Sequence, residues 1–349
     1  MRAWVKITGI ILAVSVQAAL LCSCSTEEYS QEDNSATQTV TPTPTAPPTT
    51  TTIPKQQEKK SSDIDLVIFM GEANMSGMGG DGTLAPRVSE DAGLEFRTVS
   101  DPSKLYPITE PFGNGESNPT GLNDYPGVKK GSLVSAFIDE YHKLTGRRIV
   151  AVSASMAQSD MDIWTSEGVM DDVKHRYDSA VSYLEDNGYT IGHKYVIWFQ
   201  GESDGLKGSA AKSYRTGLDK VMSPLIENGI EKVFIITPGR TIDYKDIYLT
   251  IIKTEVSLCK ESGYYAMATT ALSNVSTEYM IDQYHYNQHV LNYLGIEAAK
   301  SVAYYSLNGV EKIVYDFADE TYIVPDGVDE KSQKKEAIVY PSDIDLNGI

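Results

Sequence analysis

Cysteine is scarce in this sequence, and its scarcity excludes one class of fold. The chain has 3 cysteines in 349 residues, and two of them, Cys22 and Cys24, lie close together near the N-terminus. Cys259 therefore has no partner in the body of the chain, which excludes a small domain held together by disulfides. We expect Cys259 to be a buried structural thiol.

Basic residues and histidines are also few. Lysine and arginine number 30 against 48 aspartates and glutamates, which gives a formal net charge of -18 at pH 7. This excess of negative charge argues against nucleic acid or an anionic membrane face as a partner. The 5 histidines are scattered and have no metal-binding spacing, so we expect no metal and no cofactor.

The N-terminus carries the features of an export signal. Arg2 and Lys6 precede the apolar run "ITGIILAVSVQAALL", and residues 1–23 contain no acidic residue. The stretch "LCSC" that follows resembles a bacterial lipobox, which implies that Cys24 carries lipid. The alternative is an ordinary cleaved signal with two incidental cysteines. We expect an extracytoplasmic lipoprotein, because a diacylated cysteine anchors a chain stably to a membrane.

Residues 24–62 are rich in threonine and proline, as in "TVTPTPTAPPTTTTIP". This composition builds no core, and it predicts a disordered tether between the membrane and the folded part.

Residues 63–308 alternate between short apolar runs and amphipathic segments. Unbroken apolar runs are typical of parallel strands that helices cover on both faces. The alternation predicts one α/β domain with a parallel, doubly wound sheet, in which ligands bind at the carboxyl ends of the strands. The expected strands are residues 65–70, 148–155, 194–200, 232–238 and 264–270. We expect residues 104–132 to form a long functional loop and residues 309–349 to form an extension with a small β-hairpin.

Four motifs at strand ends resemble those of one enzyme family. They read "GEANMSG", "SMAQSDMDIW", "QGESDG" and, later, "DQYHYNQHVLNYLGIEAA". Together they resemble the SGNH (GDSL-like) hydrolases, closest to the sialate O-acetylesterase-like carbohydrate esterases. The resemblance implies a three-layer, flavodoxin-like fold and hydrolysis of acetyl esters on sugars. It also implies a catalytic pair, Asp282 and His285, of which the carboxylate orients the imidazole.

The position of the family's nucleophilic serine is Ala73, and alanine has no atom that can attack a carbonyl. The second motif also departs from the family, because Ala157 and Gln158 replace a glycine pair that helps to form the oxyanion hole. A deliberate serine-to-alanine replacement would not explain that second change. Rescue by Ser76 is disfavoured, because it would lie about 4.5 Å further along a helix. We favour a natural pseudoenzyme.

The resemblance assigns the remaining site residues to binding. Asn74, Gln158, Gln200 and Ser203 are candidates for contacts with an oxyanion or substrate. Trp164 is either a sugar-stacking residue at the rim of the pocket or a core aromatic.

The sequence therefore indicates a carbohydrate O-acetylesterase-like surface protein that is catalytically impaired and whose partner is an acetylated glycan. Two alternatives remain. One is a glycan-binding lipoprotein without catalysis, and the other is an active acetylesterase that uses a noncanonical site.

Overall fold

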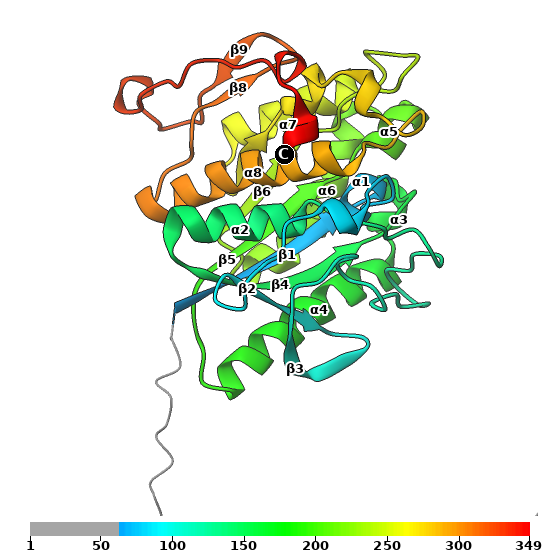
Figure 1. Ribbon diagram of the computed structural model, residues 1–349, viewed down its shortest axis with the longest axis vertical. Coiled ribbons are helices and arrows are strands. Elements are labelled where there is room, and N and C mark those ends of the chain that lie inside the picture. The colour runs from blue at the N-terminus through cyan, green and yellow to red at the C-terminus, as the bar shows by residue number, and fades with distance from the viewer. Residues whose placement is uncertain (1–62) are drawn as a thin grey trace, which may run out of the picture. The chain divides into compact units, whose positions relative to one another are not determined.

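The structure, a computed structural model, describes residues 63–349. The expected signal peptide at residues 1–23, the lipidation site Cys24 and the tether at residues 24–62 lie outside the described residues. Within the described part, no helix is both long enough and apolar enough to cross a membrane. The fold is α/β, with helices on both faces of a central sheet (Figure 1). The predicted fold class is confirmed.

The central sheet has seven strands in the order β3-β2-β4-β1-β5-β6-β7. Neighbouring strands are parallel, except β2 and β3. β1 lies in the middle, between β4 and β5, because the chain extends the sheet on both of its sides. In sheets of this kind, ligands bind at the carboxyl ends of the central strands. The strands are β1 (Asp63–Gly71), β2 (Gly93–Arg97), β3 (Asp101–Pro107), β4 (Arg148–Ser155), β5 (Thr190–Phe199), β6 (Lys232–Ile236) and β7 (Tyr265–Thr269).

The side chains of β1 show why both faces of the sheet are covered. Leu66, Ile68 and Met70 pack into one core with residues of α4, α6 and α7, while Val67 and Phe69 pack into a second core with α2 and α8. Successive side chains of a strand point to opposite faces, so an unbroken apolar run requires a helical layer on each side. The helices are α1 (Ala73–Ser76), α2 (Val134–Thr145), α3 (Met161–Trp164), α4 (Glu167–Asp186), α5 (Glu202–Lys207), α6 (Ala211–Glu227), α7 (Leu249–Glu261) and α8 (Gln288–Asn308).

Two strands at one edge of the sheet differ from the sequence prediction. β2 and β3 form an antiparallel pair there, and β3 includes residues 104–107, which we expected to begin the long loop. The loop is therefore shorter than predicted and begins after Pro107. β3 is largely exposed and contains proline, which edge strands tolerate.

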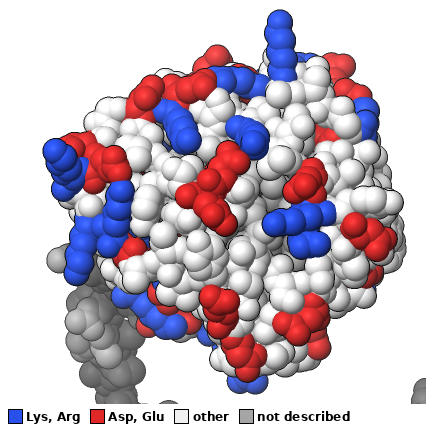
Figure 2. All heavy atoms as spheres, turned by 90° about the horizontal axis from the view of Figure 1, so that it is seen from above, with Lys and Arg blue, Asp and Glu red and all other residues white. Residues whose placement is uncertain are grey.

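The C-terminal residues form a small addition to the domain. β8 (Val314–Asp316) and β9 (Thr321–Ile323) pair as an antiparallel hairpin, which lies at the top of Figure 1. Figure 2 views the molecule from that side, and basic and acidic residues are interspersed over the face it shows. That face offers no continuous basic area that would attract a polyanion.

Candidate active site

A sharp turn follows β1 and places Ala73 at the carboxyl edge of the sheet. Gly71 has φ 149°, and a Cβ atom there would lie 1.9 Å from the carbonyl oxygen of Phe199, so only glycine fits. The backbone N–H of Glu72 donates to the same carbonyl at 3.0 Å. This contact bends the chain directly from β1 into α1, which begins at Ala73.

Asp282 and His285 form a hydrogen-bonded pair. His285 Nδ1 lies 2.8 Å from Asp282 Oδ2 and 2.9 Å from Oδ1, so Nδ1 carries the proton that the carboxylate accepts. Partial burial raises the pKa of Asp282, but hydrogen bonds from His285 and from the backbone N–H of Tyr284 outweigh it and lower the pKa overall. Nε2 has no hydrogen-bond partner among the described residues and can accept a proton.

Asn74 fixes the position of this pair beside the turn. Its Nδ2 donates to the carbonyl of Tyr284 at 3.2 Å, and its Oδ1 accepts from the backbone N–H of Tyr286 at 3.2 Å. The two residues that flank His285 are thus both bonded to the residue that follows Ala73. These bonds hold the segment that carries His285 against the residue next to Ala73, so the amide of Asn74 has a positioning role and is not free to contact substrate.

A buried pair of carboxyl groups lies beneath the site. Glu72 accepts hydrogen bonds from the backbone N–H groups of Gly201 and Ser203 at 3.0 Å each, and also from the Ser203 hydroxyl. Glu202 Oε1 accepts from Asn74 at 2.9 Å, while its Oε2 is buried and has no partner among residues 63–349. Burial raises the pKa of both carboxyl groups, and the charge of Glu72 raises that of Glu202 further. Ser203 therefore holds Glu72 and does not face a substrate.

Two of the predicted binding residues are buried elsewhere. Gln200 is 0% exposed, and its Nε2 donates to the Ser159 carbonyl at 3.0 Å and to Asp204 at 2.8 Å, so it has no donor left for an oxyanion. Trp164 is also 0% exposed and packs edge-to-face on Trp198 at 4.9 Å. The core alternative for Trp164 therefore holds, and its sugar-stacking role is wrong.

The sequence matches the family described as carbohydrate esterase, sialic acid-specific acetylesterase, over residues 63–304. The chain belongs to this family. No curated protein matches it.

Three solved structures resemble the chain at low identity. An Arabidopsis thaliana protein is 18% identical, covers 68% of this chain and 96% of its own, and has a TM-score of 0.46. A carbohydrate acetylesterase from Xanthomonas citri is 15% identical, with coverage of 69% and 57% and a TM-score of 0.42. The carbohydrate acetylesterase Est24 from Sinorhizobium meliloti is 12% identical, with coverage of 68% and 96% and a TM-score of 0.34.

The second motif of this member of the carbohydrate esterase family places a non-glycine residue in a glycine-like backbone conformation. Gln158 has φ 57°, in the left-handed region that favours glycine. Its side chain is exposed, and its backbone N–H has no acceptor among the described residues. The neighbouring N–H of Ala157 donates to Asp124 Oδ1 at 2.7 Å. One backbone donor of the kind used in oxyanion holes therefore survives in this esterase domain.

The alternative nucleophile Ser76 is not available. Its hydroxyl donates to Asp124 Oδ2 at 3.0 Å, and the residue is 2% exposed. Among the described residues, no cluster of three or more histidine, cysteine, aspartate or glutamate side chains could hold a metal ion.

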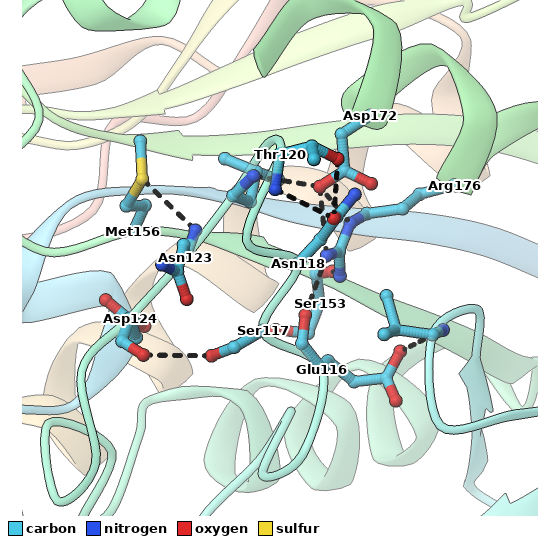
Figure 3. Close-up of polar contacts among 12 residues, drawn as sticks. Glu116, Ser117, Asn118, Thr120, Asn123, Asp124, Ser153, Met156, Asp172 and Arg176 are labelled. Carbon is cyan, nitrogen blue, oxygen red and sulfur yellow. Dashed lines mark hydrogen bonds and ion pairs between the residues drawn. The ribbon is translucent and has the colours of Figure 1, made fainter. Parts of the chain in front are cut away.

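The loop after β3 reaches the site through contacts that the sequence did not reveal (Figure 3). Arg176 of α4 donates to the carbonyls of Ser153 at 2.8 Å and Glu116 at 2.7 Å, and Asp172 accepts from the backbone N–H of Leu122 at 2.9 Å. These buried contacts fix the loop against β4 and α4. They position Asp124, which bonds both α1 and the second motif.

Two exposed tyrosines lie on or next to the segment that carries His285. Tyr284 is 41% exposed, and its ring lies 6.2 Å from that of His285. The backbone N–H of Ile242 donates to the carbonyl of Gln283 at 3.3 Å, so the loop that carries the 67% exposed Tyr244 adjoins the same segment. The position of Tyr284 directly before His285 was the available sequence signal.

Proposed function

We propose that this protein binds O-acetylated carbohydrate at the carboxyl edge of its sheet and that Ala73 disables the serine route of ester hydrolysis. The observation that carries the proposal is Ala73 at the turn after β1, with Asn74 bonded on either side of a His285 whose Nε2 has no hydrogen-bond partner in the part of the chain that the structure describes. The base and its orienting carboxylate are present, but no hydroxyl lies at the position they would activate.

Membership of the carbohydrate esterase family supports an acetylated sugar as the ligand. The exposed rings of Tyr284 and Tyr244 support it further, because an aromatic face packs well against the apolar face of a sugar. Neither ring is fully covered by protein, so both can contact a ligand at the edge of the site.

Calorimetric titration tests the binding. We expect O-acetylated sialic acid or acetylated xylo-oligosaccharides to bind, and their deacetylated forms to bind less tightly. Tyr284→Ala should weaken binding about tenfold, which corresponds to about 1.4 kcal/mol. Tyr264→Ala is the matched control, because Tyr264 is 54% exposed but precedes β7 at the opposite edge of the sheet. Equal binding of acetylated and deacetylated sugars would contradict the proposal.

Assays of acetyl release test the impairment. We expect no turnover of acetylated sugars that depends on His285. Wild-type turnover that His285→Ala abolishes would show that another nucleophile works with this histidine, and would contradict the proposed loss of the serine route.

We further propose that the chain is a lipoprotein anchored through Cys24 on the extracytoplasmic face of a membrane. Support comes from the charged and apolar segments before "LCSC" and from the threonine- and proline-rich tether after it. Cys24→Ala should release the protein into the medium or leave it unprocessed. A wild-type protein that is entirely soluble, with its mature N-terminus elsewhere, would contradict the anchor.

A further inference from the structure

A second serine lies at the same edge of the sheet as Ala73. Ser155 ends β4 and is the register partner of Gly71, two residues before Ala73. The backbone N–H of Met156 donates to the Gly71 carbonyl at 2.9 Å, which holds the two chain segments together at this point. Ser155 is 8% exposed, as are Ala73 and His285, so it is no less accessible than the family's own catalytic positions.

Ser155 has a lysine as its hydrogen-bond partner. Lys129 Nζ lies 2.7 Å from Ser155 Oγ and 3.2 Å from Asp124 Oδ2, and the Lys129 side chain is 9% exposed. The lysine comes from the loop that Arg176 and Asp172 fix against β4. Its position is therefore determined by buried contacts outside the pair itself.

The surroundings of Lys129 hold the pKa of its ammonium group below the ordinary value. Burial lowers the pKa of the ammonium group, and the positive charge of Arg176 lowers it further. The carboxylates of Asp124 and Glu110 act in the opposite direction without cancelling the effect. A neutral amine within hydrogen-bond distance can accept the proton of a serine, and serine–lysine pairs recur among hydrolases as variants of the triad.

A donor for the developing oxyanion lies close by along the chain. Gln158, three residues after Ser155, keeps its backbone N–H without an acceptor among the described residues. The left-handed conformation at φ 57° sets the direction of this N–H and costs about 1–3 kcal/mol for a residue other than glycine.

We propose that Ser155 is a second nucleophile of this protein, with Lys129 as its general base, and that it accepts acetyl groups from esters. The identity of the alcohol as a sugar rests on the proposed function. Ser155 Oγ forms a bond to the carbonyl carbon while its proton passes to Lys129 Nζ. The bond between that carbon and the alcohol oxygen then breaks, and the alcohol takes the proton from Lys129. Water, activated by the neutral amine, releases acetate and restores the serine.

A purely structural role for Lys129 makes a different prediction. As an ion-pair partner of Asp124 it would stabilise the loop, and its removal would lower stability without any effect specific to acetyl transfer. Asp124 also accepts hydrogen bonds from Ser76 and from the backbone of Ala157, so it keeps partners when Lys129 is replaced.

The test is to treat the protein with p-nitrophenyl acetate, quench with acid and locate the acetyl group by mass spectrometry of peptides. We expect acetyl-Ser155 in the wild type and a rate of nitrophenol release that rises with pH as Lys129 loses its proton. Ser155→Ala should remove the adduct and lower the rate about 100-fold or more. Ser153→Ala is the matched control, because Ser153 lies on the same face of β4 and is 3% exposed. This variant should change neither the adduct on Ser155 nor the rate of nitrophenol release.

Lys129→Met separates the two roles of the lysine. Any remaining acetylation of Ser155 should be slower and should no longer rise with pH, which a loss of stability alone would not produce. Thermal unfolding of each variant identifies those that fail to fold, and Ser155→Ala removes only one hydroxyl.

An unmodified Ser155, or an acetyl group found on Lys129 or elsewhere, would overturn the inference. Binding of acetylated sugar without an adduct would leave the proposed function standing and remove only the second nucleophile. An adduct without sugar binding would support the second nucleophile and contradict the proposed binding of acetylated carbohydrate.

Discussion

At the scale of single residues, the site lacks one oxygen atom. Ala73 stands at a glycine-dependent turn, and Asn74 holds the segment around His285 against it. Nothing in the backbone prevents a serine at this position, because the turn depends on Gly71 and not on the side chain that follows.

Ala73→Ser should therefore create esterase activity. We expect the rate on small acetyl esters to rise about 100-fold or more, since the new hydroxyl would have His285 as its general base. Measurement in a Ser155→Ala background removes the contribution of the second nucleophile. The gain should disappear in Ala73→Ser/His285→Ala. No gain at all would mean that the turn does not direct its side chain toward the imidazole.

Gln158→Gly should stabilise the fold. Glycine removes the strain of the left-handed conformation, and we expect a gain of about 1 kcal/mol in urea denaturation. Ala157 is not in this region of backbone space, so Ala157→Gly should instead lower stability by about 0.4–1 kcal/mol through added freedom in the unfolded chain. Loss of stability in Gln158→Gly would argue against strain at this position.

Motif spacing was enough to predict that Ala73 follows a strand-end turn and that Asp282 bonds His285, because the residues of such a turn or of a short D-x-x-H segment cannot move far apart. It was not enough for Trp164 and Gln200. Both follow a strand closely, but whether such a side chain turns toward solvent or into the core depends on the partner it meets. The partners, Trp198 and Asp204, come from other segments of the chain.

At the scale of elements, the sequence predicted β1, β4, β5, β6 and β7 because their apolar runs are covered on both faces. It missed β2 and β3. In β2 the charged Glu95 interrupts the apolar residues, and β3 is largely exposed and contains two prolines, so neither sequence reads as an unbroken apolar run. The loop after β3 then depends on long-range contacts with α4, which no local pattern reveals (Figure 3).

Asp172→Ala should release this loop. Asp172 is the acceptor for Leu122 and the ion-pair partner of the buried Arg176, and removal of one partner of a buried pair costs about 3–5 kcal/mol. Asp178→Ala is the control on the same helix, because Asp178 forms an i,i+4 pair with Lys174 on the exposed face and should cost about 1 kcal/mol or less. Urea denaturation gives the free energy of unfolding of both variants. Equal losses of stability would show that the buried pair does not fix the loop.

At the scale of the whole molecule, acidic groups collect in the interior beneath the site. Glu72, Glu202 and Glu255 are buried, and burial raises the pKa of each, with like charges adding to the effect on Glu202 and Glu255. A group with a raised pKa binds more protons in the folded state than in the unfolded state. Stability therefore falls as pH rises above the usual carboxyl value of 4.5 toward the raised pKa.

Glu202→Gln should weaken this pH dependence. The amide keeps the oxygen that accepts from Asn74, and it cannot ionise, so the variant avoids the cost of a buried second charge. The gain in melting temperature should be larger at about pH 8 than at about pH 4, because the wild-type carboxyl is protonated at the lower pH. Glu185→Gln, on the exposed surface of α4, should change neither value. A gain that is equal at both pH values would contradict a titrating Glu202.

The single thiol in the body of the chain makes it possible to measure the rate at which the interior opens. Cys259 lies in α7, is 1% exposed, and is the only cysteine after residue 24; burial raises the pKa of its thiol. An alkylating reagent can reach this thiol only when α7 separates from the sheet. The rate of alkylation therefore reports on that opening in the unmodified protein. A sugar that binds only the closed form should lower the rate of Cys259 alkylation by the factor 1 + [L]/Kd, whether or not any ester is cleaved.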